Sequence, residues 1–414
     1  MRLSEEEVRE FVRGATDGSW TEGQLAAFLM AAAIRGLDVD ETRALTLAML
    51  ESGERWRLAD DVPTLCDKHS TGGVGDKTSL VLPFLLASCG LPIAMLAGRG
   101  LGHSGGTMDK LESIPGIDLD LDRQRFLDLI ARCGIAIGGA TSGIAPADRR
   151  LYALRDVTAT VDSLPLITGS ILSKKLAMGA AAVVFDVKVG NGAFLTDPES
   201  ARELARSLVE ISRALGTAVS ALITDMNQPL GRTCGNTSEV KESLDCLEGN
   251  GPADLMEVTC LLAEEVSKLV GRPLSRADLE DAVSSGRARE RFDQWAGLQG
   301  ADPAWLRAPR LDLAPVERPL RAPRSGRLAH VDTRQIGMLL IEAGAGRVRP
   351  DSKIDYGVSL EMRSRLGDEV REGDELARLW LRRDDERLVR LFEECLTVGE
   401  EGTAPELILG NLTP

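Results

Sequence analysis

The stretch that decides the fold is AAVVFDVKVG at residues 181–190, an apolar run that ends in glycine and is long enough for one strand. The runs LPIAMLAG (91–98) and AVSALITDM (218–226) have the same character, and helical patterns lie between the three. Strands that are apolar on both faces and alternate with helices are typical of a parallel sheet covered by helices. We therefore predict an α/β unit with a mostly parallel central sheet.

Helical patterns flank this unit. Residues 1–60 contain two capping boxes, Ser4 with Glu7 and Thr21 with Gln24, and Asp40 can cap a third helix that runs through ETRALTLAML. The stretch 147–179 is also helical and apolar, and we expect it to return to the N-terminal helices. Together these segments predict a small all-helical domain.

A polar connection with five prolines between Pro303 and Pro323 follows the α/β unit and is typical of extended chain. Short strand-like pieces separated by the turns GDE (367–369) and EGDE (372–375) then predict a β-rich end. The predicted divisions are a helical domain in two parts (1–62 and 145–179), an α/β domain in two parts (63–144 and 180–322) and a C-terminal α+β subdomain (323–414).

Composition argues against several classes of protein. With 64 acidic and 49 basic residues, the formal net charge is −15, which disfavours binding to nucleic acid. The uncharged stretch Ser79–Gly98 is interrupted by Pro83, Gly90 and Pro92, so we predict a buried helix and a buried strand there rather than a membrane span. The seven cysteines form no CxxC pair and the N-terminus lacks a signal peptide, which together predict a cytoplasmic protein with reduced thiols.

The densest chemical signal is KHSTGGVGDKTS at residues 68–79. Its three glycines free the backbone to turn tightly, so that several N–H groups can point at one anion. Hydroxyls and a lysine add side-chain donors, although the spacing matches neither a Walker A loop nor GxGxxG. The segment predicts a phosphate loop, and the alternative is a glycine-rich turn with incidental polar residues.

Two further segments carry polar groups. GRGLGHSGGT (98–107) directly follows an apolar run, and since ligands of open α/β sheets bind at the carboxyl ends of strands, both glycine-rich segments predict a shared pocket. Its His103 is either a site residue or a structural one. Farther along, Ser170 and Lys174 share a helix face, and Arg155 offers a planar fork that suits the carbonyl oxygens of a flat ring. Taken alone, such an arginine and lysine are more often solvated.

These segments together resemble the thymidine and pyrimidine nucleoside phosphorylase family. The matching stretches are KHSTGGVGDKTS (68–79), GRGLGHSGGTMDKLESIPG (98–116), APADRRLYALRDVTATVDSLPLITGSILSKKLA (145–177), FDVKVGNGAF (185–194) and TDMNQPLGRTCGN (224–236). The resemblance implies a helical and an α/β domain with the site in the cleft between them, and a homodimer, which we expect to form through the helical domain. It also implies that inorganic phosphate cleaves the glycosidic bond of a pyrimidine nucleoside, releasing the base and a sugar 1-phosphate, with no required cofactor.

The resemblance also assigns roles residue by residue. Phosphate is expected to bind Lys68, Ser70, Thr71, Gly73, Ser79 and Thr107, with the loop amides of 71–75. The catalytic residues that hold the pyrimidine are expected to be His69, Arg155, Ser170 and Lys174. The apolar pocket around the base is expected to comprise Met95, Leu101, Val161, Ile167 and Phe194. Protonated His69, with Arg155 and Lys174, would then stabilise the negative charge of the departing base.

Some positions depart from the family pattern. Ala97 stands where the family usually has a phosphate-contacting serine, and Gly169 stands where alanine is usual. Some relatives bind a monovalent cation, and the matching positions here are Gly75, Leu230, Thr233 and Glu242. Lys77 lies inside that region in this chain.

Substrate preference and two rival functions stay open. Met95 matches thymidine-preferring members, whereas broader pyrimidine enzymes carry lysine there, which favours thymidine and deoxyuridine over uridine. One rival is a phosphoribosyltransferase related to anthranilate phosphoribosyltransferase, which would use a pyrophosphate sugar donor and magnesium. The base-facing set of Arg155, Ser170 and Lys174 argues against it. The other rival is a non-catalytic nucleoside-binding protein, favoured only by Ala97.

Overall fold

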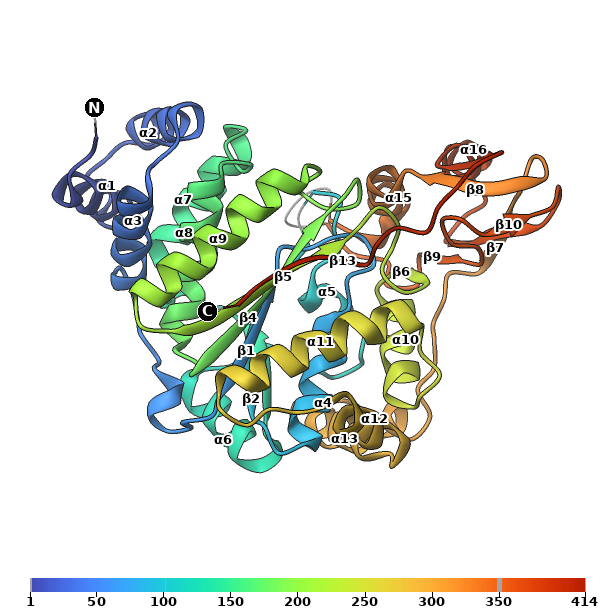
Figure 1. Ribbon diagram of the computed structural model, residues 1–414, viewed down its shortest axis with the longest axis horizontal. Coiled ribbons are helices and arrows are strands. Elements are labelled where there is room, and N and C mark those ends of the chain that lie inside the picture. Colours follow the sequence, from blue (N-terminus) through green and yellow to red (C-terminus); the bar gives the residue numbers. More distant parts are fainter. Residues whose placement is uncertain (1, 101, 348–351, 414) are drawn as a thin grey trace.

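The computed structural model describes residues 2–100, 102–347 and 352–413. Five helices form the helical unit at the upper left of Figure 1. They are α1 (Glu5–Asp17), α2 (Glu22–Arg35), α3 (Val39–Glu51), α7 (Pro146–Val157) and α8 (Leu164–Met178). A core that includes Phe11, Leu25 and Leu151 joins the first three helices to the later pair. The predicted return of the stretch 147–179 to the N-terminal helices is therefore confirmed.

The helix caps agree with the sequence at two of three positions. Ser4 and Thr21 make the predicted capping boxes of α1 and α2. The prediction that Asp40 caps α3 is wrong, because Asp38 accepts from the amide of Glu41 and the Glu41 carboxylate accepts from the amide of Asp38. Asp40 lies inside the first turn and pairs with Arg2 on the surface.

A six-stranded sheet forms the centre of the α/β unit, in the order β13-β5-β4-β1-β2-β3. The first five strands along the chain are parallel, as predicted, whereas β13 is antiparallel to β5. The end of the chain thus returns to the central sheet. The strands are β1 (Cys66–Ser70), β2 (Ile93–Ala97), β3 (Ile135–Gly139), β4 (Ala182–Val189), β5 (Ala218–Asp225) and β13 (Ile408–Leu412).

Helices cover both faces of this sheet (Figure 1). One face packs against α8 together with α6 (Arg123–Cys133) and α9 (Pro198–Ala214). The other face packs against α4 (Leu82–Ser88), α10 (Thr237–Leu247), α11 (Ala253–Leu269), α12 (Arg276–Ser284) and α13 (Arg287–Leu298). The buried helix and strand expected within 79–98 are α4 and β2. Within the described ranges, no helix combines the length and apolar character needed to cross a membrane.

The C-terminal unit is rich in antiparallel strands, as predicted, and forms two small sheets, β10-β8-β12 and β6-β9-β11-β7. Its strands are β6 (Thr233–Gly235), β7 (Val316–Arg321), β8 (Gly326–Val331), β9 (Ser359–Met362), β10 (Glu369–Val370), β11 (Glu375–Leu381) and β12 (Leu396–Gly399). Three helical segments accompany them, α15 (Thr333–Leu340), η3 (Ile341–Ala345) and α16 (Glu386–Glu394).

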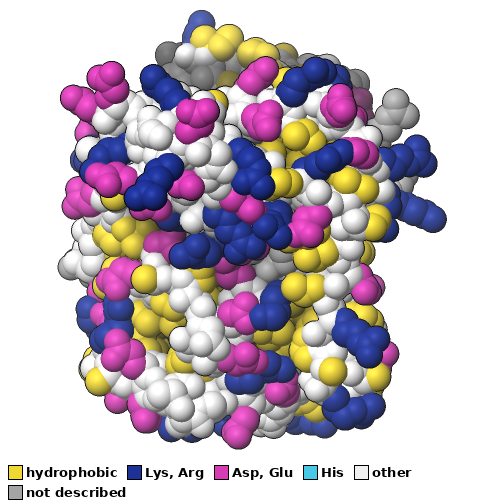
Figure 2. All heavy atoms as spheres, turned by 90° about the vertical axis from the view of Figure 1, so that its right-hand side faces the viewer, with side chains coloured by type: hydrophobic (Ala, Val, Ile, Leu, Met, Phe, Trp, Pro, Cys, Tyr) yellow, Lys and Arg dark blue, Asp and Glu magenta, His cyan; other side chains and the backbone are white. Residues whose placement is uncertain are grey.

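The segment 303–323 is less extended than its prolines suggest. It begins with α14 (Pro303–Arg307) and ends in β7, where Pro319 is tolerated because β7 is an edge strand. The face of the molecule shown in Figure 2 carries this C-terminal unit and intersperses basic with acidic side chains. In the C-terminal unit, Arg318, Arg378 and Arg382 each pair with a carboxylate.

Candidate active site

The first glycine-rich segment begins on a strand. Lys68, His69 and Ser70 are the last three residues of β1, and the chain then turns through Gly72 and Gly75, both at positive φ. The short helix η2 (Thr78–Leu80) brings two hydroxyls back to the buried Lys68, whose Nζ lies 2.6 Å from Thr78 Oγ1 and 3.0 Å from Ser79 Oγ. The segment therefore folds around an ammonium group.

Further charges are buried around Lys68. Lys188 and Asp186, from the neighbouring strand β4, form an ion pair of 2.8 Å, and Asp186 lies 3.9 Å from the Lys68 ammonium. Burial raises the pKa of Asp76, but Lys68, Lys188 and Lys110 outweigh it and hold that pKa well below its ordinary value. Asp76 accepts from the Ser70 hydroxyl at 2.5 Å. The site thus contains buried lysines whose ammonium groups can attract an added anion, and the carboxylates of Asp76, Asp186 and Glu239 lie among them.

The expectation that the loop amides of 71–75 face an anion needs correction. The amide of Thr71 donates to Asp186 O at 3.0 Å, that of Gly72 to Ser70 Oγ at 3.0 Å, and that of Val74 to Gly192 O at 3.1 Å. These three amides hold the loop together. Gly73 makes a bridge with Ala193, and the Thr71 hydroxyl accepts from the amide of Lys188. The donors suited to an anion are therefore mainly side chains.

The second glycine-rich segment lies against the first, as predicted. A Cβ at Gly72 would lie only 3.4 Å from Ser104 Oγ and 3.7 Å from Phe194. The His103 ring packs against Phe194, with 4.9 Å between ring centroids, and its Nε2 lies 3.1 Å from Gly192 O, so His103 has a structural role there. Thr107 begins the short helix α5 (Thr107–Leu111). Leu101 lies outside the described residues.

Ala97 is the last residue of β2, and Gly98 beside it is exposed with open space around its α-carbon. The carboxyl ends of β1 and β2 therefore lie next to each other, at the same edge of the sheet. A serine hydroxyl at position 97 would project from this edge, where the family usually has one.

The helical unit supplies the second group of polar residues. Arg155 is buried at the end of α7 and donates to the carbonyls of Val161 (2.6 Å), Leu166 (3.1 Å) and Thr160 (3.3 Å). Three of its five N–H groups thus hold the connection between α7 and α8. The guanidinium therefore shapes this end of the unit in addition to any contact with a ring.

Ser170 and Lys174 lie on one face of α8, as their spacing predicts. Lys174 Nζ donates to Ser170 Oγ at 3.1 Å and also pairs with Asp148 on α7. The departure at Gly169 has a physical reason, because a Cβ there would lie 2.7 Å from Cε of Met49 on α3. The methionine fills the space that an alanine methyl would take.

One lysine joins the two groups. Lys175, next to Lys174, reaches from α8 into the sheet, where its Nζ lies 2.9 Å from Asp67 Oδ1 and 3.0 Å from the carbonyl of Lys68. Both side chains of the ion pair are almost fully buried. The helix that carries Ser170 and Lys174 is therefore fixed to the strand that carries Lys68 and His69.

His69 lies between these groups and is neutral. Desolvation, followed by the ammonium groups of Lys175 and Lys68, lowers the pKa of His69 well below its ordinary value. This shift disfavours the protonated imidazole that the resemblance implies. A neutral imidazole still has one N–H donor, so His69 can donate a hydrogen bond without carrying charge.

The expected apolar pocket is only partly brought together. Val161 and Ile167 lie near Arg155 and on α8, whereas Phe194 lies at the glycine-rich loops. Met95, which was expected in this pocket, lies elsewhere. It is 2% exposed and belongs to the core on the sheet face covered by α4 and α11, opposite the face that packs against α8. Successive strand residues point to opposite faces, so Ala94 and Leu96 face α8 instead.

The positions expected near a monovalent cation surround a lysine. Lys77 Nζ lies 2.8 Å from Leu230 O, 2.9 Å from Thr233 O and 2.6 Å from Glu242 Oε2. The ammonium stands among the oxygens that would ligate a cation, so the residues present do not fit an additional ion.

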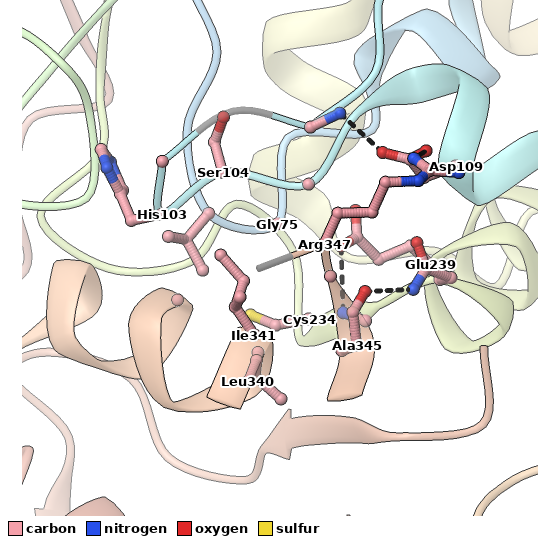
Figure 3. A pocket seen from close by; sticks show the side chains of 18 residues that line it. Gly75, His103, Ser104, Asp109, Cys234, Glu239, Leu340, Ile341, Ala345 and Arg347 are labelled. Atoms are coloured by element: carbon pink, nitrogen blue, oxygen red, sulfur yellow. Dashed lines mark hydrogen bonds and ion pairs between the residues drawn. The ribbon is translucent and has the colours of Figure 1, made fainter. Parts of the chain in front are cut away.

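Behind the second glycine-rich segment lies a small cavity of about 40 Å³ (Figure 3). Gly75, His103 and Asp109 line it from the α/β unit, and Leu340, Ile341 and Arg347 line it from the C-terminal unit. Asp109 accepts from the amide of Gly100 at 2.6 Å and pairs with Arg347. The C-terminal unit thus buttresses the loop that contains Thr107, but Arg155, Ser170 and Lys174 are absent from the residues that line this cavity.

Comparisons with known proteins agree with this arrangement. Models of the glycosyl transferase family match its helical bundle domain at residues 1–53 and its a/b domain at 62–289, and a pyrimidine nucleoside phosphorylase C-terminal domain matches 328–398. The chain belongs to this glycosyl transferase family. Thymidine phosphorylase of Rhizobium meliloti (strain 1021) is 47% identical over 91% of this chain and 87% of its own length.

Two other known proteins are also similar to this chain. Pyrimidine-nucleoside phosphorylase of Geobacillus stearothermophilus is 40% identical over 99% of this chain and 96% of its own. The solved anthranilate phosphoribosyltransferase of Thermus thermophilus has a TM-score of 0.59 at 20% identity, covering 72% of this chain and 96% of that one. The similarity to the phosphoribosyltransferase shows only that the two proteins share a fold.

Several charged residues around the candidate site were missed by the sequence analysis. They are Asp67, Asp76, Lys110, Asp148, Lys175, Asp186 and Lys188. A signal existed for two of them, because Asp186 and Lys188 interrupt an otherwise apolar strand, where ionised residues are rare unless paired. Lys175 had no such signal, since a lysine that follows another lysine on a helix is ordinarily expected to be exposed to solvent.

We predict that the two adjacent lysines of α8 differ in their effect on stability. Lys175→Met should lower the free energy of unfolding by about 3–5 kcal/mol, because it leaves Asp67 buried without its partner. Lys174→Met should cost less, about 1–2 kcal/mol, because the Lys174 side chain is partly exposed although Asp148 is buried. Urea unfolding of the two variants measures this difference. The double variant Asp67→Asn/Lys175→Met should recover part of the loss, and equal losses in both single variants would contradict the proposed link.

Proposed function

We propose that this protein cleaves pyrimidine nucleosides with inorganic phosphate, giving the free base and a (2-deoxy)ribose 1-phosphate. The observation that carries the proposal is the Lys175 link, which fixes a polar group on α8 to a cation-rich strand end on β1. Relatives named thymidine phosphorylase and pyrimidine-nucleoside phosphorylase, matching over most of the chain, support the same reaction. The two rival functions have no comparable support, since the likeness to a phosphoribosyltransferase shows only the fold.

The phosphate is assigned to the carboxyl end of β1. Lys68 supplies the charged donor, and hydroxyls nearby supply neutral ones. The remaining contacts are assigned to the loop and to the start of α5, giving the set Lys68, Ser70, Thr71, Gly73, Ser79 and Thr107. Hydrogen bonds to an ionised partner are the stronger kind, so Lys68 should dominate the affinity.

The pyrimidine is assigned to the α8 side of the cleft. Ser170 and Lys174 present a hydroxyl and an ammonium from one helix face, Arg155 adds N–H groups, and neutral His69 reaches from β1. An oxygen of phosphate attacks C1′ while the C1′–N bond breaks, and the electron pair of that bond leaves with the base. Lys174 and Arg155 then stabilise the negative charge that develops on the carbonyl oxygens of the base. Excluding water from the cleft prevents it from replacing phosphate as nucleophile.

Thymidine and deoxyuridine are the favoured substrates in this proposal, with uridine as the broader alternative. Met95 no longer supports that order, because it lies in the core on the other face of the sheet. The remaining support is that one relative named thymidine phosphorylase is 47% identical to this chain, whereas two named pyrimidine-nucleoside phosphorylase are 40% and 41% identical.

Base release should require inorganic phosphate but no magnesium, and should be faster from thymidine than from uridine. Chromatographic measurement of free thymine and uracil, with and without phosphate or a chelator, checks this. Lys68→Ala should raise the KM for phosphate roughly 10- to 100-fold, as expected for one hydrogen bond to a charged group. Lys241→Ala, which removes a lysine on α10 paired with Asp245, should leave it unchanged. Base release only with a pyrophosphate sugar donor and magnesium would contradict the proposal.

Arg155→Ala and Lys174→Ala should lower kcat on thymidine more than on a nucleoside whose base is more acidic. Such a base leaves with less assistance, so losing a donor that acts on the developing charge matters less. Steady-state turnover on both substrates gives the comparison, and Arg149→Ala, an exposed position on α7, is the matched control. If each variant lost the same factor on both substrates, these residues would hold the domains together instead of assisting the departing base.

We also propose that the protein is a homodimer formed through the helical unit. Ile34 and Met30 on α2 and Val39 at the start of α3 are apolar and exposed, Ile34 by 75%. Light scattering should give the mass of two chains of 44.5 kDa, and Ile34→Glu should shift it toward one. A wild-type mass of one chain at micromolar concentration would contradict the dimer.

A further inference from the structure

Lys77 is buried as deeply as any charged residue of the described chain, with a side chain that is 0% exposed. It belongs to the first glycine-rich segment, and its ammonium contacts the segment that leads into α10. Burial lowers the pKa of Lys77, but Glu242 and Glu239 outweigh it and raise that pKa, so the ammonium is retained.

The three oxygens around the ammonium come from separate residues. Two are backbone carbonyls, of Leu230 and Thr233, and the third belongs to the Glu242 carboxylate. That carboxylate is itself held by the amides of Arg232 and Thr233 and by the Thr233 hydroxyl, at 2.9–3.1 Å. Carbonyl and carboxylate oxygens fixed in this way form the kind of cage that replaces the hydration shell of a metal cation.

The backbone closes tightly around this cage. Gly231 has a φ of +72°, and a Cβ there would lie 3.1 Å from Lys77 Nζ and 2.6 Å from Glu242 Oε2. A Cβ at Gly75, with a φ of +78°, would lie 3.2 Å from both carbonyl oxygens. Glycine at both positions lets two chain segments approach one central charge.

The cage is connected to the proposed phosphate site through the chain itself. Thr78 and Ser79 follow Lys77 directly, and their hydroxyls hold the ammonium of Lys68. Anchoring Lys77 therefore fixes the segment that positions Lys68. Losing the Lys77 contacts would free this segment from β6 and α10 and lower the affinity for phosphate.

We propose that the Lys77 ammonium is a built-in monovalent cation, and that truncating this side chain converts its cage into a site for potassium or ammonium ions. In the wild-type protein, the covalently attached charge makes the fold independent of such ions. The effect of truncating Lys77 on phosphate binding rests on the proposed function, whereas its effect on stability does not.

The test compares thermal unfolding of wild type and Lys77→Ala in potassium, ammonium, sodium and choline chloride at equal ionic strength. Wild type should have the same midpoint in all four salts. Lys77→Ala leaves Glu242 buried without its partner, so it should unfold at a lower temperature in choline and regain several degrees in potassium or ammonium. Sodium should restore less, because it is too small to reach all three oxygens. Under the proposed function, the KM for phosphate of Lys77→Ala should also fall roughly tenfold from choline to potassium.

Two matched variants separate the cage from a general salt effect. Lys77→Met fills the same space without charge, and Lys77→Ala/Glu242→Gln removes the anionic ligand, so neither should respond to potassium. A potassium-dependent midpoint in wild type would overturn the proposal, as would a folded Lys77→Ala with equal midpoints in potassium and choline. Failure of both Lys77→Ala and Lys77→Ser to fold in either salt would also overturn it, since potassium would then be unable to replace the ammonium. The unfolding readout needs no nucleoside, so it stands even if phosphorolysis fails.

Discussion

The reach of Lys175 from α8 to Asp67 and the carbonyl of Lys68 is the interaction on which the arrangement of the site depends. Without it, the helix that carries Ser170 and Lys174 would be fixed to the sheet mainly by apolar contacts, which have no direction. A buried ion pair with an added carbonyl contact has a defined geometry, and breaking one side of it is costly. The two halves of the site are thus joined by one directional contact in addition to their apolar packing.

Local charge, rather than net charge, explains how an acidic chain can hold an anion. The formal net charge is −15, yet Lys68, Lys110, Lys175 and Lys188 gather near the carboxyl ends of β1 and β4, where each pairs with a buried carboxylate. Parallel strands bring these ends to one edge, so residues far apart in the chain share one field. Desolvation, followed by the same lysines, lowers the pKa of His69 well below its ordinary value. Assistance to the departing base then falls to Lys174 and Arg155.

Sequence patterns predicted the parallel sheet, the helical unit and the two glycine-rich loops, because each depends on local periodicity or on backbone freedom. They failed where the outcome depends on packing between distant segments. Asp38 and Asp40 are both suitable caps, and in the structure the helix begins at Val39, directly after Asp38. The resemblance placed Met95 in the pocket, whereas the side chains of β2 alternate between the two faces of the sheet and Met95 lies on the face that α8 does not cover. The amides of 71–75 were expected to face an anion, but Asp186, Ser70 and Gly192 use three of them. The roles of the individual site residues stay predictions.

Phosphorus-31 NMR of the protein with thymidine and inorganic phosphate tests the central claim most directly, because it follows the bond that phosphorolysis forms. The account predicts that the phosphate resonance declines while a sugar 1-phosphate resonance grows in equal amount to the thymine released. Thymine released without any loss of inorganic phosphate would mean that water is the nucleophile, and would contradict the assignment of Lys68 and its neighbours to phosphate.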